Sequence, residues 1–447
     1  MTRLTRRGLS LGPLVAVMFF TVSGGPFGLE GLVGDVGPGL ALLLLVATPV
    51  LYSVPEALLI AELASMLPLE GGYYQWVKRA FGPFWGFWNG WLSWTYSLVD
   101  MAIYPVLFVQ YLRFFAPSVS RFESWLLALV VIWGATWLNL RGTRIVGRAS
   151  GWSVVVVLTP FAVLSVAALR QWLGGSPPAP FPMRPFHAPG TSFAGALGIG
   201  ISQSIWNYSG WDNASTIGGE IDRAAVTYPR AVGRTLPLVT AVYLLAVIPV
   251  LALTQWTRWS DGAWPALGAA LVGPGLGRWL AGAGMVSAFA LFNALLLAYS
   301  RIPLVLAQDG LFPRGLAAID SRHTPRTAVL LSAVAYSAFA LLSFGGLLAA
   351  DVLLYSTALA LEFAALIRLR HREPELVGPF RLPVGTGVLV ALASLPLTLI
   401  AVAVALELQS RTIGVPGVAI ALALGALGPL AYAVLHSGPR GAQGVGA

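Results

Sequence analysis

Long apolar segments, separated by short polar or Pro/Gly-rich joints, repeat along the whole chain. Each segment is long enough to cross a hydrocarbon layer of about 30 Å. The pattern therefore predicts an all-α integral membrane protein with about twelve transmembrane helices. The apolar windows are centred near Val17, Leu45, Leu92, Val130, Val157, Ile201, Leu245, Leu291, Val334, Leu359, Leu395 and Leu424.

Two of these apolar segments contain an irregular stretch. Residues 22–30 read VSGGPFGLE, and residues 204–213 read SIWNYSGWDN. Irregular backbone at membrane depth is tolerated only where protein or a cavity surrounds it. Broken helices at corresponding positions of two halves are typical of secondary transporters. We therefore expect broken helices 1 and 6 in a 5+5 inverted repeat.

The repeat predicts one membrane transporter domain over residues 1–447. Its first five-helix repeat would cover residues 9–173 and its second residues 191–370, with two additional helices in residues 384–436. The joints between the apolar segments are short, and none of them suggests an appended soluble domain.

Composition supports a membrane protein and gives its orientation. The chain is 57% hydrophobic and 10% charged, with a mean hydropathy of +0.77. Of its 27 basic residues, roughly twenty fall on one set of alternate loops, so the positive-inside rule places both termini in the cytoplasm. This placement accounts for the net charge of +9 without a nucleic-acid partner. We expect a multi-pass protein of a bacterial inner membrane.

The first irregular stretch supplies candidate binding groups from the backbone. Around Ser23, Gly24 and Gly25, a helix N-terminus would hold a carboxylate, and exposed carbonyl groups would hold an ammonium group. Pro26 would fit the first turn of the outer half-helix, and Phe27 follows it. A simple proline kink is the alternative.

Carboxylates within the apolar segments are the next candidates. Glu30, Asp100 and Asp212 lie where ionisable residues are costly and indicate a site for a cation. Each has a structural alternative: Glu30 would compensate the helix dipole, Asp212 would cap the inner half-helix, and Asp100 would bond to neighbouring helices.

Aromatic and amide side chains accompany these acids. Aromatic rings surround ammonium groups and methylenes favourably. The candidates are Tyr104, Trp206, Asn207, Tyr208 and Trp211. Ordinary helix packing is an equally good explanation for Tyr104 and Trp211.

Several motifs, in this order, resemble the amino acid, polyamine and organocation (APC) transporter superfamily. The chain looks most like its polyamine-uptake and L-type amino acid transporter-like branch. The resemblance implies a LeuT-like fold with alternating access, in which Trp206 matches a bulky aromatic gate on the external side. The motifs are VSGGPFGLE at 22–30, EGGYYQWV at 70–77, FGPFWGFWNGW at 81–91, DMAIYPVLF at 100–108, WNYSGWDNASTIGGEI at 206–221, AQDGLFP at 307–313, LLYSTALALEF at 353–363 and PFRLPVGT at 379–386.

The substrate has two candidates at this stage. Three acids would attract a polyamine, but residues 293–300 are neutral where the polyamine branch carries acids in span eight. An amino acid would then fit as well. We expect a secondary active permease of amino acids or polyamines across the plasma membrane, working as a proton-coupled symporter of a cationic amine. The alternatives are a neutral or cationic amino acid exchanger or uniporter, and a transporter-like nutrient sensor or channel.

The resemblance implies a lysine in the fifth span of many proton-coupled relatives, but the fifth apolar segment here contains none. A carboxylate that gains and loses a proton would replace it, and exchange without protons is the alternative. Glu30, Asp212 and Glu362 are the candidates. No nucleophile, metal set or acid pair suggests an enzyme, no cofactor is indicated, and the oligomeric state stays open. At the cytoplasmic ends we expect Glu62, Glu70 and Glu220 to pair with arginines among Arg141, Arg144, Arg148 and Arg223.

Overall fold

The computed structural model describes residues 8–175, 184–321, 324–340, 347–410 and 415–437. Within these ranges the regular structure is helical, and the only β pairing is two isolated bridges, Leu9 with Ile221 and Glu70 with Ile217. The prediction of an all-α protein is confirmed for the described residues.

The first half of the chain ends with α8. It contains α1 (Leu11–Val22), α2 (Leu29–Val36), α3 (Pro38–Thr48), the π-helical turn η1 (Pro49–Ser53), α4 (Val54–Met66), α5 (Gly72–Phe81), α6 (Pro83–Leu112), α7 (Arg121–Asn139) and α8 (Thr143–Leu173).

The second half begins with α9. It contains α9 (Phe193–Tyr208), the 3-10 turns η2 (Asn213–Thr216) and η3 (Gly218–Glu220), α10 (Ala224–Leu253), η4 (Trp256–Arg258), α11 (Trp264–Leu271), α12 (Pro274–Tyr299), α13 (Arg301–Gln308), η5 (Arg314–Ala317), α14 (Arg326–Phe339), α15 (Leu347–Arg372), α16 (Thr386–Ser410) and α17 (Val415–Ser437).

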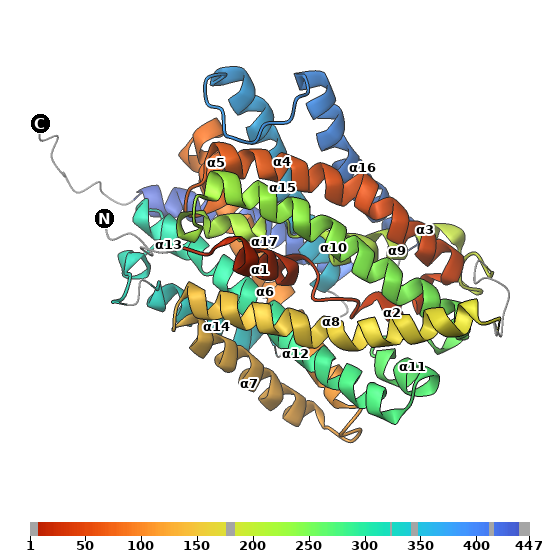
Figure 1. Ribbon diagram of the computed structural model, residues 1–447. Helices are drawn as coiled ribbons and strands as arrows, with labels where there is room; N and C mark the ends of the chain where they lie inside the picture. Colours follow the sequence, from red (N-terminus) through yellow and green to blue (C-terminus); the bar gives the residue numbers. More distant parts are fainter. Residues whose placement is uncertain (1–7, 176–183, 322–323, 341–346, 411–414, 438–447) are drawn as a thin grey trace, which may run out of the picture.

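Eight helices in the described ranges are long and apolar enough to cross a membrane. Three shorter apolar helices, Leu11–Val22, Arg326–Phe339 and Ala421–Leu435, accompany them. The long helices run side by side, with α5 and α13 at one end of the bundle and α2 and α11 at the other (Figure 1). Outward-facing apolar side chains such as Trp152, which is 75% exposed, suit contact with lipid.

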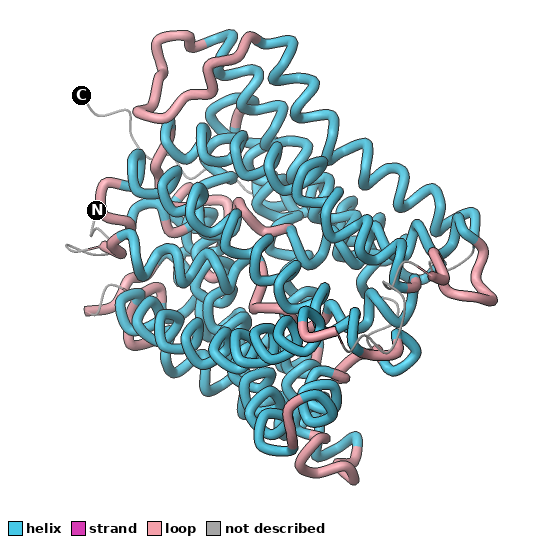
Figure 2. Tube along the Cα trace, turned by 45° about the vertical axis from the view of Figure 1, so that its right-hand side comes forward, coloured by secondary structure: helices cyan, strands magenta, loops and turns pink. Residues whose placement is uncertain are grey.

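Helix α1 lies in the middle of this bundle and packs on α8, α10 and α12. Beyond its end at Val22 the chain is irregular until α2 begins at Leu29. Gly24, Gly25 and Gly28 have φ values of 82°, 92° and 99°, which only glycine adopts without strain. Non-helical segments, pink in Figure 2, therefore lie inside the bundle as well as at its ends.

The structure corrects two details of the expected breaks. Pro26 precedes α2 instead of occupying its first turn, because the left-handed Gly28 delays the helix start to Leu29. After α9, the chain continues through 3-10 turns and not through an α-helix. A short helix, α11, follows the turn at Asp261 and Gly262.

Candidate functional site

A cavity lies in the centre of the bundle, where the irregular chain after α1 meets α6, α9, α12 and α15. The free space between its side chains is about 40 Å³, which is room for very few water molecules. A larger substrate therefore enters only if wall residues move, as in carriers that close around their cargo.

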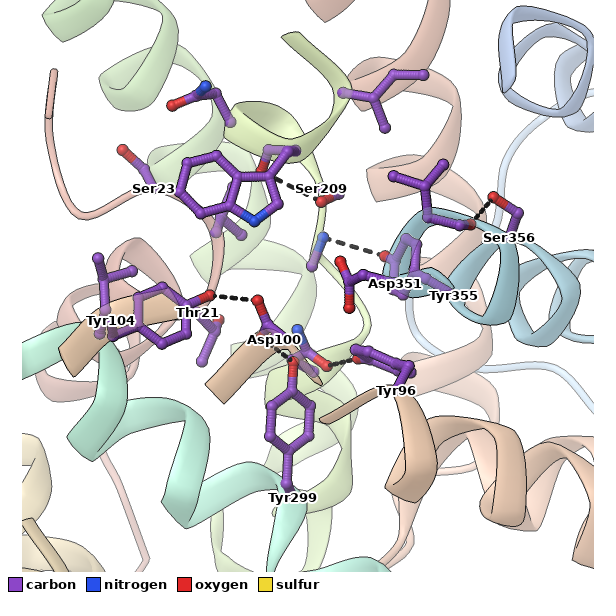
Figure 3. Close-up of a pocket in the computed structure, with 18 of the residues that line it drawn as sticks. Thr21, Ser23, Tyr96, Asp100, Tyr104, Ser209, Tyr299, Asp351, Tyr355 and Ser356 are labelled. Atoms are coloured by element: carbon purple, nitrogen blue, oxygen red, sulfur yellow. Dashed lines mark hydrogen bonds between the residues drawn. The ribbon is translucent and has the colours of Figure 1, made fainter. Parts of the chain in front are cut away.

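Two carboxylates from different helices line this cavity. Asp100 of α6 and Asp351 of α15 point toward the same space (Figure 3). Asp100 accepts hydrogen bonds from the hydroxyls of Tyr104 at 2.8 Å and Tyr299 at 3.0 Å. Asp351 is 6% exposed, and its Oδ1 has no hydrogen-bond partner among the described residues. None of the ion pairs in the described ranges includes either acid, so neither has a cationic side chain as its partner there.

Tyrosine rings form one wall of the cavity. The ring of Tyr96 lies edge-to-face with Tyr299 at 5.5 Å and with Tyr355 at 5.3 Å. The hydroxyl of Tyr96 donates to Asn213 Oδ1 at 2.9 Å, which fixes this ring. Aromatic faces next to carboxylates suit an alkyl chain that carries ammonium groups.

Most backbone N–H groups of the irregular chain are already bound within the protein. Gly25 N–H donates to Ser23 Oγ at 3.0 Å. The N–H groups of Ser23 and Gly24 both reach Phe19 O, at 2.8 and 3.3 Å. Pro26 has no N–H to offer. The N–H groups of Ser23, Gly24 and Gly25 are therefore not free to bind a substrate carboxylate.

Glu30 completes this internal bonding. Its Oε2 accepts the N–H of Gly28 at 2.8 Å, and its Oε1 accepts Tyr111 Oη–H at 2.5 Å and Gly262 N–H at 3.0 Å. Glu30 does not line the cavity. It links α2, α6 and the loop before α11. In that loop, burial raises the pKa of Asp261, and the charge of Asp35 adds to the effect.

A second group of buried acids lies behind the cavity. The hydroxyl of Tyr355, which lines the cavity, is 2.7 Å from Glu56 Oε1 and 2.9 Å from Asp212 Oδ1. It accepts Gly210 N–H at 3.0 Å. Asp212 precedes η2, but its side chain makes no capping hydrogen bond to that turn, so the alternative role as a helix cap is not supported. Glu362 of α15 is fully buried nearby.

Ion pairs close the end of the bundle opposite α11. Arg301 is fully buried, 2.8 Å from Glu220 and 3.9 Å from Glu70. Arg370 binds Glu62 at 2.5 Å. The acids expected to form ion pairs do so, but the arginine partners named from the sequence were wrong. The start of α13 and the end of α15 bring different arginines to these acids.

The cavity contains half of the site residues predicted from the sequence. Ser23, Phe27, Asp100, Tyr104, Trp206 and Asn207 line it, whereas Gly24, Gly25, Glu30, Tyr208, Trp211 and Asp212 do not.

Two of the others serve packing. Tyr208 donates its hydroxyl to Leu45 O at 3.1 Å, and Trp211 donates Nε1–H to Tyr208 O at 2.9 Å. Sequence reasoning missed Asp351 and Tyr355. A carboxylate at the start of an otherwise apolar segment was the available signal for Asp351.

Comparisons with known proteins identify the family. The model of the amino acid permease family matches residues 14–424. A probable polyamine transporter of Arabidopsis thaliana is 35% identical over 93% of this chain and 85% of its own. A polyamine transporter of rice, Oryza sativa subsp. japonica, is 34% identical over 86% and 71%. A branched-chain amino acid permease of Lactococcus lactis is 26% identical over 73% and 72%.

A solved structure shows the same fold. MhsT, solved in complex with L-phenylalanine, superposes with a TM-score of 0.55 over 96% of this chain and 99% of that chain, at 13% identity. The fold is therefore LeuT-like. The chain is a multi-pass transporter, not an enzyme, and belongs to the amino acid permease family within the APC superfamily, in its polyamine-transporter branch.

Proposed function

We propose that the protein carries linear polyamines across a membrane. The observation that carries this proposal is the pair of carboxylates, Asp100 and Asp351, that face one cavity without a cationic side chain paired to them in the described ranges. Intramembrane acids are expensive to bury and are compensated by a cation. A chain with two ammonium groups supplies one positive charge for each acid. The relatives described as polyamine transporters agree with this choice.

The second acid of the cavity lies on a different helix from the one that the sequence comparison with the polyamine branch suggested. Span eight, now seen as α12 and α13, is neutral in residues 293–300. Asp351 of α15 supplies the acid instead, so the neutral segment no longer argues for an amino acid.

The bonding of the first irregular stretch also favours a substrate without a carboxylate. In a carrier of amino acids, free N–H groups at a helix break would bind the substrate carboxylate. Here Gly25 and Gly28 donate to Ser23 and Glu30 instead. An amino acid would have to displace these bonds and bring its own negative charge next to Asp100 and Asp351.

We propose that four shorter helical segments complete twelve spans. The α1–α2 pair, α9, α14 and α17 would join the eight long helices. Residues 9–173 and 191–370 would form the inverted repeat of one transporter domain, with two added helices in residues 384–436. By the positive-inside rule, the basic loops support a cytoplasmic position for both termini.

The two polyamine transporters compared above come from plants, so they do not support the expected location in a bacterial inner membrane.

We further propose that transport is coupled to protons as a symport. Buried carboxylates outside the cavity, Asp212 and Glu362, supply exchangeable protons. Trp206 lines the cavity, is only partly buried, and is proposed as the external gate. Glu30 would act on the same side through the loop that it holds.

Binding of three small molecules of equal chain length tests the substrate. Putrescine, n-butylamine and 4-aminobutyrate each contain four carbons. Putrescine carries two ammonium groups and n-butylamine carries one. 4-Aminobutyrate carries one ammonium group and one carboxylate. Calorimetry on the purified protein should rank them in this order, with putrescine at least about tenfold tighter than butylamine. Equal or tighter binding of 4-aminobutyrate would contradict the polyamine proposal.

A further inference from the structure

The hydroxyl of Tyr355 contacts more acceptors than it has protons. Its oxygen lies 2.7 Å from Glu56 Oε1 and 2.9 Å from Asp212 Oδ1. A phenol has one proton and donates it to one of these carboxylates. The short contact to the other carboxylate needs a second proton, carried by that carboxyl group. The geometry therefore requires a proton on Glu56 or Asp212.

Glu362 adds a third acid that lacks any donor. It is fully buried, and neither of its carboxylate oxygens has a hydrogen-bond partner among the described residues. Glu56 Oε2 is unpartnered in the same way. An ionised carboxylate buried without a cation or donor costs several kcal/mol. A proton on Glu362 removes that cost.

The acceptor for such a proton is in place. Asn89 of α6 donates Nδ2–H to Ala358 O at 3.1 Å, which leaves its Oδ1 free to accept. Asn89 Oδ1 is itself buried and unpartnered, so it is available as an acceptor for a protonated Glu362.

Tyrosines from several elements surround the three acids. Tyr52 of η1, Tyr73 of α5, Tyr96 of α6 and Tyr228 of α10 lie near Glu56, Asp212 or Glu362. None of the ion pairs in the described ranges includes these three acids. A proton on one or more of these acids would therefore compensate their charge.

We propose that Glu56, Asp212 and Glu362 form a proton-binding site around Tyr355, behind the substrate cavity. Its role in transport rests on the proposed proton coupling. Tyr355 lines the cavity and touches Glu56 and Asp212 through the same hydroxyl. Movement of this ring around a substrate therefore changes which acid receives its proton. The site thereby links cavity occupancy to protonation, and the link is reciprocal.

Infrared difference spectroscopy of the purified protein tests the site without any substrate. The wild type should show the C=O stretch of a protonated, buried carboxylic acid near neutral pH. Glu362→Gln should reduce this band, and so should at least one of Glu56→Gln and Asp212→Asn, whereas Glu375→Gln, an exposed acid near the end of α15, should leave it unchanged. A band of unchanged intensity in all three buried variants would overturn the proposal.

Proteoliposomes test the coupling role. Labelled putrescine uptake by the wild type should increase severalfold under an inward proton gradient, and a sodium gradient should not replace it. Glu362→Gln should retain putrescine exchange without a gradient and lose this stimulation. Retained stimulation in Glu362→Gln, Glu56→Gln and Asp212→Asn would overturn the coupling role. If the wild type takes up no putrescine, the proposed substrate is wrong, and the infrared result still decides the proton site.

Discussion

The carboxylate of Glu30 accepts the backbone N–H of Gly28 at 2.8 Å, two residues before it in the sequence. The protein thus places its own carboxylate at the start of α2, where it accepts an N–H group that a helix N-terminus would otherwise offer to an anion. Gly25 is bound by Ser23 in a similar way. We interpret both bonds as the basis for choosing a cation that has no carboxylate.

Removal of the Asp351 charge should abolish the preference for diamines. Asp351→Asn keeps the size of the side chain, but one ammonium group of putrescine loses its partner, which should weaken putrescine binding at least about tenfold. The affinity for n-butylamine should change much less. Calorimetry with both amines measures this difference. Equal losses for the two amines would show that Asp351 serves folding and not the second ammonium group.

Glu30→Gln should slow transport more than it weakens binding, because Glu30 lies outside the cavity and holds the loop at Gly262. The amide cannot accept all three hydrogen bonds, so the outer closure loosens. Initial uptake rates should fall about tenfold or more with a small change in putrescine affinity. A large loss of affinity with an unchanged maximal rate would place Glu30 in direct contact with substrate.

Trp206→Ala should accelerate substrate release. Trp206 lines the cavity and is only partly buried, so its loss opens a path from the site. The dissociation rate of labelled spermidine should rise about tenfold, because affinity differences appear mainly in dissociation. Trp152→Ala is the matched control, since Trp152 is 75% exposed on α8. An unchanged release rate in Trp206→Ala would remove it as a gate.

The buried ion pair at the α13 end of the bundle should control access from that side. Arg301→Lys keeps the charge but loses the planar fork that contacts Glu220 and Thr143. The chain contains no cysteine, so a single Ser356→Cys in the cavity reports access to a membrane-impermeant thiol reagent. Arg301→Lys should raise labelling from this side severalfold. Arg79→Lys, at an exposed pair with Glu373, is the control.

Asp261→Asn should stabilise the protein at neutral pH. The pKa of Asp261 is raised by burial and by Asp35, so the ionised form costs stability above the folded pKa and this cost disappears at low pH. The melting temperature should rise by roughly 1 °C at pH 7, with no difference below about pH 4. At Glu373 the hydrogen bond from Arg79 lowers the pKa, so Glu373→Gln should show the opposite sign. A change of the same sign in both variants would contradict these two assignments.

The sequence predicted the membrane helices, the two irregular stretches and most acids of interest. These features depend on composition and local order: glycines beside a proline mark an irregular backbone, and carboxylates in apolar runs are conspicuous. Asp100 and Tyr104 were found in this way, one helical turn apart on α6, and they do share a hydrogen bond.

The missing parts of the site depend on tertiary packing. Asp351 belongs to α15, which packs against α6 although some 250 residues separate Asp100 from Asp351 in the sequence. No local pattern reveals that pairing. Tyr355 resembles an ordinary packing residue until Glu56 and Asp212 are seen on its hydroxyl. The arginine partners of Glu62 and Glu220 were misassigned for the same reason.

The most direct test of the central claim is uptake of labelled putrescine into proteoliposomes under an inward proton gradient, with unlabelled amino acids as competitors. The structure predicts saturable uptake that spermidine blocks and that a large excess of neutral or cationic amino acids leaves unchanged. Uptake of an amino acid, or its effective competition with putrescine, would contradict the assignment of Asp100 and Asp351 to two ammonium groups.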